Sequence, residues 1–308
     1  MTGENDPAYD LNQVLPAEAR DALRHLEIFA RKMADGLLHG AHQSRRKGVS
    51  TEFDHHKLYQ PGDPIKHVDW KASARHERYY VKRYIEDTAL RVRLVVDGSG
   101  SLNQQTDPCQ VYLQVARLAA SMAYLIVRQR DSVGMVMSRA GSTRWLPCSS
   151  TQRQLVQILR MLASARPEAG DNLEDALRAV LERDARRGMI VLVSDLLFDP
   201  EPVRREIRRL QARGHEVLVL QVRDPAVETF PYNRWMQFDS LERPGVRYRL
   251  DTVPLKRFYL EEFQLFMDGW HKWTKRHDVH FLSLRSDESI EGALATYMAL
   301  RAGRGMGP

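Results

Sequence analysis

Residues 91–101 read RVRLVVDGSGS, an apolar and β-branched run that ends at Asp97 and leads into a loop of alternating glycine and serine. Such a run, bounded by turn-forming residues, is typical of a strand that is buried on both faces of a parallel sheet. Ligands of open parallel sheets bind outside the carboxyl ends of the strands. The loop after this strand is therefore the first place to look for function.

Downstream of this loop, the sequence alternates between segments with strand character and segments with helix periodicity. Further strands are expected at VGMVMS, MIVLVSD, EVLVLQV, RYRL and VHFLSL, with TRWLPC as a hairpin partner of the first. Helices are expected at about residues 110–130, 151–164, 173–186, 201–213 and 254–276, with a last helix that ends near Arg301. Repeated strand and helix units with continuous apolar strands predict an α/β fold with a doubly wound, mainly parallel sheet.

The chain upstream of residue 91 has a different character. Residues 16–38 have the three- and four-residue apolar spacing of an amphipathic helix. The segment that follows is rich in Gly, Pro, His and aromatic residues, which favour loops and short strands. We therefore divide the chain into a tail and helix at residues 1–40, a loop and strand extension at 41–90, and the doubly wound domain at 91–303.

The composition is that of an ordinary globular protein, with 43% hydrophobic and 28% charged residues in a chain of 308. No stretch approaches the ~18 consecutive apolar residues of a membrane span, and the start, MTGENDPAYD, lacks the features of a secretory signal. The two cysteines are too few for a disulfide framework. We therefore expect a soluble, cytoplasmic protein without a membrane span.

Arginine dominates the positive charge, because 37 of the 46 basic residues are arginine and 9 are lysine. The chain also has 40 acidic residues and a net charge of +6, so we expect most arginines in surface ion pairs. The sequence has no RNA-recognition signature, zinc-finger spacing or sustained basic heptads. We expect no nucleic-acid partner, and the basic pI alone keeps nucleic-acid binding as an alternative.

Two of the predicted strands end in an aspartate. Asp97 is followed by Ser99 and Ser101 at alternate positions, and Asp195 ends MIVLVSD. The loop EAGDNLEDAL can bring Asp171 to the same edge of the sheet. Carboxylate and hydroxyl oxygens are hard ligands, so we expect these five residues to bind Mg²⁺ or Mn²⁺ weakly, on surface loops above the sheet.

A purely structural interpretation of the same aspartates stays open. Asp97 can cap the next helix within a turn of glycine and serine, and Asp195 can form hydrogen bonds at the end of its strand. Asp171 can be the N-cap of the helix that begins at Asn172.

The loop after the first strand resembles the metal-ion-dependent adhesion site of von Willebrand factor A domains. In those domains an Asp-x-Ser-x-Ser motif, a threonine from a second loop and an aspartate after a later strand surround one magnesium. Asp97, Ser99 and Ser101 match the motif, Asp195 matches the later aspartate, and Asp171 stands where that family has threonine. The resemblance implies a von Willebrand factor A-like, Rossmann-like three-layer fold.

The upstream segment resembles the bacterial family catalogued as domain of unknown function 58. The matching residues are Ser44, Arg45, Gly48, Glu52, Phe53, Tyr59, Pro61, Gly62, Asp63, Asp69, Trp70, Ala74 and Arg75, and Lys57 and Lys66 stand where arginine is expected. The resemblance covers roughly residues 40–300 and is closest to the short soluble form of the family. It implies an association with a MoxR-type AAA+ ATPase, since members are typically found beside one.

Two interpretations of the segment around Pro61 and Trp70 remain. In the structural one, Pro61 and Gly62 form a tight turn and Trp70 is buried against the sheet. In the functional one, Tyr59, Asp63 and Arg75 form a surface that docks a partner protein.

These observations favour a non-catalytic, metal-assisted protein-interaction module that works with a MoxR-type AAA+ ATPase in complex assembly or chaperone-like maturation. The chain lacks the Gly-x-x-x-x-Gly-Lys loop of ATPases, so an ATPase must be a partner, and the cation is expected to bind an acidic residue of a partner protein. The alternatives are a metal-dependent hydrolase or phosphatase that uses Asp97 and Asp195, and a basic nucleic-acid-binding protein.

Overall fold

A computed structural model describes this chain over most of its length. The described residues are 17–44, 53–60, 68–70, 72–73, 78–84, 90–103, 105–106, 109–139, 141–170, 173–184, 186–243 and 245–304. The chain forms two compact units. The larger consists of Met1–Leu37 and Leu90–Tyr297, and the smaller of Leu38–Ala89 and Met298–Pro308.

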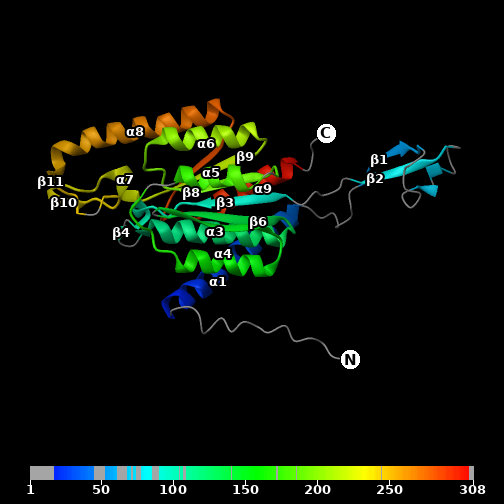
Figure 1. The fold of residues 1–308 in the computed structure, drawn as a ribbon, viewed down its shortest axis with the longest axis horizontal. Helices are drawn as coiled ribbons and strands as arrows, with labels where there is room; N and C mark the ends of the chain where they lie inside the picture. The colour runs from blue at the N-terminus through cyan, green and yellow to red at the C-terminus, as the bar shows by residue number, and fades with distance from the viewer. Residues whose placement is uncertain are drawn as a thin grey trace. The chain divides into compact units, whose positions relative to one another are not determined.

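The larger unit is built on a six-stranded sheet with the order β12-β9-β8-β3-β6-β7 (Figure 1). The strands are β3 (Arg91–Val96), β6 (Ser132–Arg139), β7 (Ser142–Ser149), β8 (Met189–Ser194), β9 (Glu216–Arg223) and β12 (His280–Arg285). Neighbouring strands are parallel except for β6 and β7, which form the expected antiparallel hairpin. The sequence-based prediction of an α/β fold with a doubly wound, mainly parallel sheet is confirmed.

Helices cover both faces of this sheet. In Figure 1, α3 (Val111–Arg128) and α4 (Gln152–Ser164) lie on one face, and α5 (Leu173–Arg183) and α6 (Pro200–Ala212) lie on the other. Val95 and Leu192 of the central strands pack into one buried cluster with Leu177, Ile207 and Trp270. Because both faces of β3 and β8 are covered, their sequences are apolar at every position except Arg91, Arg93 and Ser194.

One of the described helices, α3, is long and apolar enough to cross a membrane, and 72% of it is buried inside the fold. A helix between a sheet and a second helix layer needs apolar residues around most of its circumference, as a membrane span does. The composition of α3 is therefore accounted for by its place in the core.

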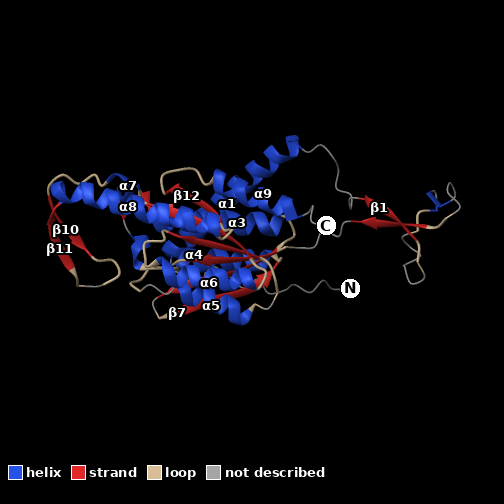
Figure 2. Cartoon of the chain, turned by 90° about the horizontal axis from the view of Figure 1, so that it is seen from above, coloured by secondary structure: helices blue, strands red, loops and turns tan. Residues whose placement is uncertain are grey.

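The long helix α8 (Thr252–Arg276) begins at an antiparallel hairpin of β10 (Trp235–Asp239) and β11 (Arg247–Asp251), as Figure 2 shows. Asp251 accepts a hydrogen bond from the Val253 N–H and caps this helix. The sequence predicted β11 and α8, but it did not predict β10 or the short helix α7 (Pro225–Thr229). An aromatic cluster fixes the hairpin on the helix, and its members are Phe230, Tyr232, Phe238 and Tyr259.

The remaining elements are α1 (Ala17–Ser44), the 3₁₀-helix η2 (Gly100–Asn103), β4 (Gln105–Thr106), β5 (Cys109–Gln110) and α9 (Glu291–Arg304). Helix α1 is longer than the predicted 16–38, and Leu26, Ala30 and Ala34 on its apolar face are buried.

The smaller unit contains the antiparallel pair β1 (Phe53–Leu58) and β2 (Tyr80–Tyr84). Beside this pair, the expectation that Trp70 is buried against the sheet is wrong. Its side chain is 62% exposed and meets the ring of Tyr79 edge-on, at 6.2 Å between ring centroids. An aromatic residue with one edge contact keeps most of its surface in water, so Trp70 adds little to a core here.

Helix α1 contains a glycine that its surroundings do not require. Gly36 is exposed, and a Cβ atom added there would meet nothing within 4 Å. Glycine in a helix interior lowers the free energy of unfolding by roughly 0.5–1 kcal/mol relative to alanine, because glycine loses more conformational freedom when the chain folds. We expect Gly36→Ala to raise the free energy of unfolding by about that amount.

Urea unfolding followed by circular dichroism measures this effect. Gly141→Ala is the control, because Gly141 also has open space around it but has φ +65°, which strains alanine. A stability decrease in Gly36→Ala would contradict the prediction.

Candidate metal centre

Strand order brings Asp97 and Asp195 together. Asp97 follows β3 and Asp195 follows β8, and these parallel strands are direct neighbours in the sheet. The Asp97 N–H donates to the Val193 carbonyl at 3.0 Å, so the ladder continues up to the first aspartate. The two carboxylates therefore leave the sheet at the same edge and in adjacent positions.

The side chain of Asp97 is held on both oxygens. Its Oδ1 accepts from the Ser99 N–H at 2.9 Å and from the Ser138 hydroxyl at 3.3 Å, and its Oδ2 accepts from the Ser194 hydroxyl at 2.5 Å. The residue is only 1% exposed, so the expectation that it lies on a surface loop is wrong. Ser138 and Ser194 were not expected at the site from the sequence, although each ends an apolar run at the same edge as the aspartates.

Hydroxyl groups line the space beside Asp195. The Ser99 and Ser101 hydroxyl oxygens are 3.0 Å apart, and the Ser101 hydroxyl donates to the Asp195 carboxylate. The Leu197 N–H donates to Asp195 Oδ1 at 3.1 Å. Leu196, between them, has a positive φ of 60°, a conformation that is rare for leucine. The chain therefore turns sharply as it passes Asp195.

Both aspartates also form the short-range backbone hydrogen bonds that the structural interpretation predicts. Asp97 accepts from the N–H two residues ahead, directly before η2, and Asp195 does the same with Leu197. These bonds use one oxygen of each carboxylate. They position the side chains, but they supply no positive charge to offset the burial of two neighbouring carboxylates.

The electrostatics of this pair are unfavourable for two bare carboxylates. Burial raises the pKa of Asp97. Burial, followed by the negative charge of Asp97, raises the pKa of Asp195 to about 7. In the part of the chain that the structure describes, no lysine, arginine or histidine forms an ion pair with either residue. A bound cation would remove this penalty, since opposite charge favours the ionised form.

The donor set fits a water-rich magnesium site. Two carboxylates and two hydroxyl groups are hard oxygen donors, and Mg²⁺ usually keeps several waters beside a few protein ligands. Among the described residues, no group of three or more His, Cys, Asp or Glu side chains is placed to hold a metal. A cation bound here would therefore be coordinated by serine hydroxyls and water beside the two carboxylates, and such a site is expected to bind weakly.

The glycines of this loop allow a close approach of backbone to backbone. A Cβ atom on Gly98 would lie 2.2 Å from the Ser138 carbonyl oxygen, and one on Gly100 would lie 2.3 Å from the Leu241 carbonyl oxygen. Neither glycine has a positive φ. Space, and not backbone conformation, is therefore the reason for glycine at both positions.

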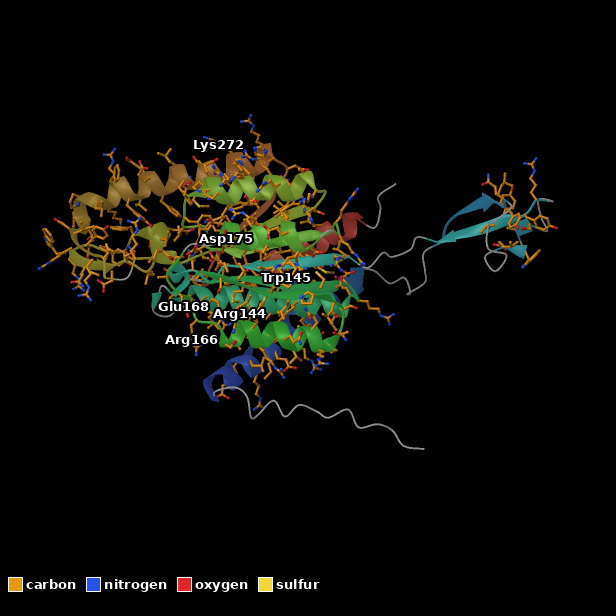
Figure 3. All side chains as sticks on the ribbon, in the orientation of Figure 1. Arg144, Trp145, Arg166, Glu168, Asp175 and Lys272 are labelled. Carbon is orange, nitrogen blue, oxygen red and sulfur yellow. The ribbon has the colours of Figure 1, made fainter. Side chains whose placement is uncertain are left out.

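The loop before α5 also contacts the Asp97 loop of the candidate metal centre. The Glu168 N–H donates to the Gly98 carbonyl at 3.1 Å, and Ser99 and Glu168 form a parallel bridge. Figure 3 labels Glu168 at this end of the sheet. The loop continues toward Asp171, which lies outside the described residues, so its roles as ligand or helix cap remain predictions.

Glu242, which lies between β10 and β11, was not expected at the site from the sequence. Its Oε1 accepts from the Ser101 N–H at 2.6 Å, and its Oε2 accepts from the Gly170 N–H at 2.9 Å. The negative charge of Glu242 also contributes to the raised pKa of Asp195. No local pattern marks Glu242, because its partners are 141 and 72 residues away in the sequence.

The predicted docking residues lie in the smaller unit. The Tyr59 N–H donates to the Tyr79 carbonyl at 2.8 Å, and the two rings meet edge-on at 6.4 Å between centroids. The side chain of Tyr59 is half-buried. Asp63 and Arg75 lie outside the described residues, so a docking surface built from the three stays a prediction.

Comparison with protein families and curated proteins gives consistent results. Residues 55–257 match the family described as "Protein of unknown function DUF58". Uncharacterized proteins of Mycobacterium bovis and Mycobacterium tuberculosis are 34% identical to this chain over 209 residues, which make up 66% of this chain and 65% of each relative. The chain thus spans slightly less than two thirds of the length of these relatives.

Solved structures with partial structural similarity were also found. BatB from Bacteroides thetaiotaomicron is 17% identical, with a TM-score of 0.46, and the match covers 70% of this chain and 100% of that one. An aerotolerance-related membrane protein from Bacteroides fragilis is 16% identical, with a TM-score of 0.47 and the same coverage. The SpRpn10 VWA domain is 8% identical, with a TM-score of 0.39, over 68% of this chain and 95% of that domain.

The family predicted from the sequence agrees with the family match. The strand order, the antiparallel edge strand β7 and the Asp-x-Ser-x-Ser loop after β3 make the larger unit von Willebrand factor A-like. The family match extends over more than half of the sequence. This chain belongs to the DUF58 family.

Proposed function

We propose that this protein is a non-catalytic interaction module that uses a weakly bound Mg²⁺ or Mn²⁺ to hold an acidic side chain of a partner protein. Asp97, Ser99, Ser101 and Asp195 would hold the cation. The observation that carries the proposal is the burial of Asp97 and Asp195 directly after adjacent strands, at 1% and 3% exposure, without an ion-pair partner among the described residues. A cation offsets that arrangement and supplies an open coordination position.

The partner and the setting of this module are part of the same proposal. Resemblance to DUF58 proteins supports a MoxR-type AAA+ ATPase as partner, in complex assembly or chaperone-like maturation. The sequence has no Gly-x-x-x-x-Gly-Lys loop of its own, so ATP hydrolysis would belong to the partner. We place the protein in the cytoplasm, where free Mg²⁺ can occupy a weak site.

Isothermal titration calorimetry with MgCl₂ and MnCl₂ tests the metal site. We expect wild type to bind either ion in the millimolar range and Asp97→Asn to bind at least about tenfold more weakly, because a carboxylate ligand is lost. Asparagine is chosen over alanine because Asp97 accepts three hydrogen bonds in a buried position. Asp175→Asn is the matched control, since Asp175 is an exposed residue of α5 (Figure 3) and pairs with Arg178.

The same variants test partner binding. A MoxR-type AAA+ ATPase should be retained on immobilised wild type and Asp175→Asn in MgCl₂, and it should be released by chelator and by Asp97→Asn. Equal heats for wild type and Asp97→Asn, or no heat from either at millimolar metal, would rule out the metal site. Retention that is unaffected by chelator would show that the interaction surface lies elsewhere.

A further inference from the structure

The turn between β10 and β11 lies directly against the candidate metal centre. A Cβ atom on Gly100 would meet the Leu241 carbonyl oxygen, so backbone packs on backbone at this point. The next residue, Glu242, extends its carboxylate between two loops. One is the Asp97 loop, through the Ser101 N–H, and the other is the loop before α5, through the Gly170 N–H.

These two N–H groups form a receptor for a carboxylate. Each oxygen of Glu242 accepts one bond, at 2.6 Å from Ser101 and 2.9 Å from Gly170. Gly170 has φ +128°, a conformation that other residues rarely adopt, and this conformation aims its N–H at the carboxylate. Hydrogen bonds from N–H groups to a charged carboxylate are about twice as strong as those between neutral groups. Any acidic side chain of suitable reach satisfies the same two donors.

This receptor lies beside the proposed cation site, where the proposed function requires a partner carboxylate to bind. Ser101 donates its hydroxyl to Asp195 and its N–H to Glu242, so the receptor and the proposed cation site share one residue. A partner carboxylate seated on these two N–H groups would therefore lie beside the cation. Glu242 is partly exposed, so it can leave the receptor without unfolding its surroundings.

We propose that the Ser101 and Gly170 N–H groups are the binding site for the partner's acidic side chain, and that Glu242 fills it as an internal substitute that the partner displaces. The inference rests on the proposed function. A tethered carboxylate competes at an effective concentration in the millimolar range or above, so a free carboxylate must lose to it. A partner gains the advantage by further contacts, for example with Leu241, which is 40% exposed beside Glu242.

Acetate is the probe for this receptor, and the amide signals of Ser101 and Gly170 in ¹⁵N-labelled protein are the readout. In Glu242→Ala, acetate should shift both signals saturably, and it should bind at least about tenfold more tightly than it binds wild type. Glu242→Gln keeps one oxygen acceptor and should lie between the two. Acetamide, which has the same shape without charge, should leave both signals unchanged in all proteins.

Asp239→Ala is the matched control, because Asp239 is an acidic residue of the same hairpin that pairs with Arg247. It should behave as wild type does. Equal acetate binding by wild type and Glu242→Ala would overturn the inference, as would acetate shifts in Glu242→Ala that spare Ser101 and Gly170.

The titration is run in MgCl₂ and again in chelator, which separates the two proposals. If Mg²⁺ strengthens acetate binding to Glu242→Ala, both the receptor and the cation-bridged function are supported. If acetate binds equally well in chelator, the receptor stands and the cation-bridged function is contradicted.

Discussion

In chelator at pH 8, Asp195→Asn is expected to be more stable than wild type by about 4 kcal/mol, because the buried charge beside Asp97 is removed. The ordinary pKa of 3.8 is raised to about 7 in the folded protein. An acid with a raised pKa in the folded state destabilises that state when it is ionised. The cost is therefore absent below about pH 4, grows up to about pH 7, and stays constant above it.

Urea unfolding of the chelated proteins at pH 5 and pH 8 measures this dependence. Wild type should be more stable at pH 5 than at pH 8, and Asp195→Asn should lose much of that difference. Addition of MgCl₂ at pH 8 should stabilise wild type and leave Asp195→Asn unchanged, since a ligand that binds only the folded state stabilises it. Asp175→Asn, at an exposed position, serves as control.

The opposite result would change the interpretation of the site. If Asp195→Asn is less stable than wild type in chelator at pH 8, the hydrogen bonds from Leu197 and Ser101 to the ionised carboxylate outweigh its desolvation. Asp195 would then be a structural residue, and the argument for a cation would lose its electrostatic basis.

Gly98→Ala is expected to destabilise the protein by about 3 kcal/mol, because alanine does not fit between two central strands. Its Cβ would lie 2.2 Å from the carbonyl oxygen of Ser138, which is a buried residue of β6. The Gly98 N–H also donates to the Ser138 hydroxyl at 3.1 Å, so a shift that relieves the clash breaks this bond. A strand that is paired on both sides cannot move without disturbing its neighbours.

Gly100→Ala is the informative comparison for this effect. Its Cβ would lie 2.3 Å from the Leu241 carbonyl oxygen, on the turn of a two-stranded hairpin that can give way. We expect a smaller loss of stability, together with displacement of Glu242 and stronger acetate binding. The two variants are compared by urea unfolding, and equal losses of stability would show that the hairpin turn is as rigid as the sheet.

Local sequence patterns determined the strands and the first two acidic residues of the site. RVRLVVD and MIVLVSD are apolar because β3 and β8 are covered on both faces, and that burial is visible in the residue types themselves. Aspartates directly after such runs must lie at the carboxyl edge of a parallel sheet. The resemblance to DUF58 proteins identified the family, which the match to residues 55–257 then showed.

Only the tertiary structure decided what surrounds those aspartates. Strand order places Ser138 of β6 next to Asp97, and no pattern within either segment encodes that neighbour. The expected burial of Trp70 failed for a related reason, since an aromatic residue is buried only where other segments cover it. Glu242 accepts a hydrogen bond from Ser101, which is 141 residues away in the sequence, because the β10–β11 hairpin packs against the candidate metal centre. Contacts of this kind depend on how distant elements pack, and hydrophobic periodicity reports only which face of each element is covered.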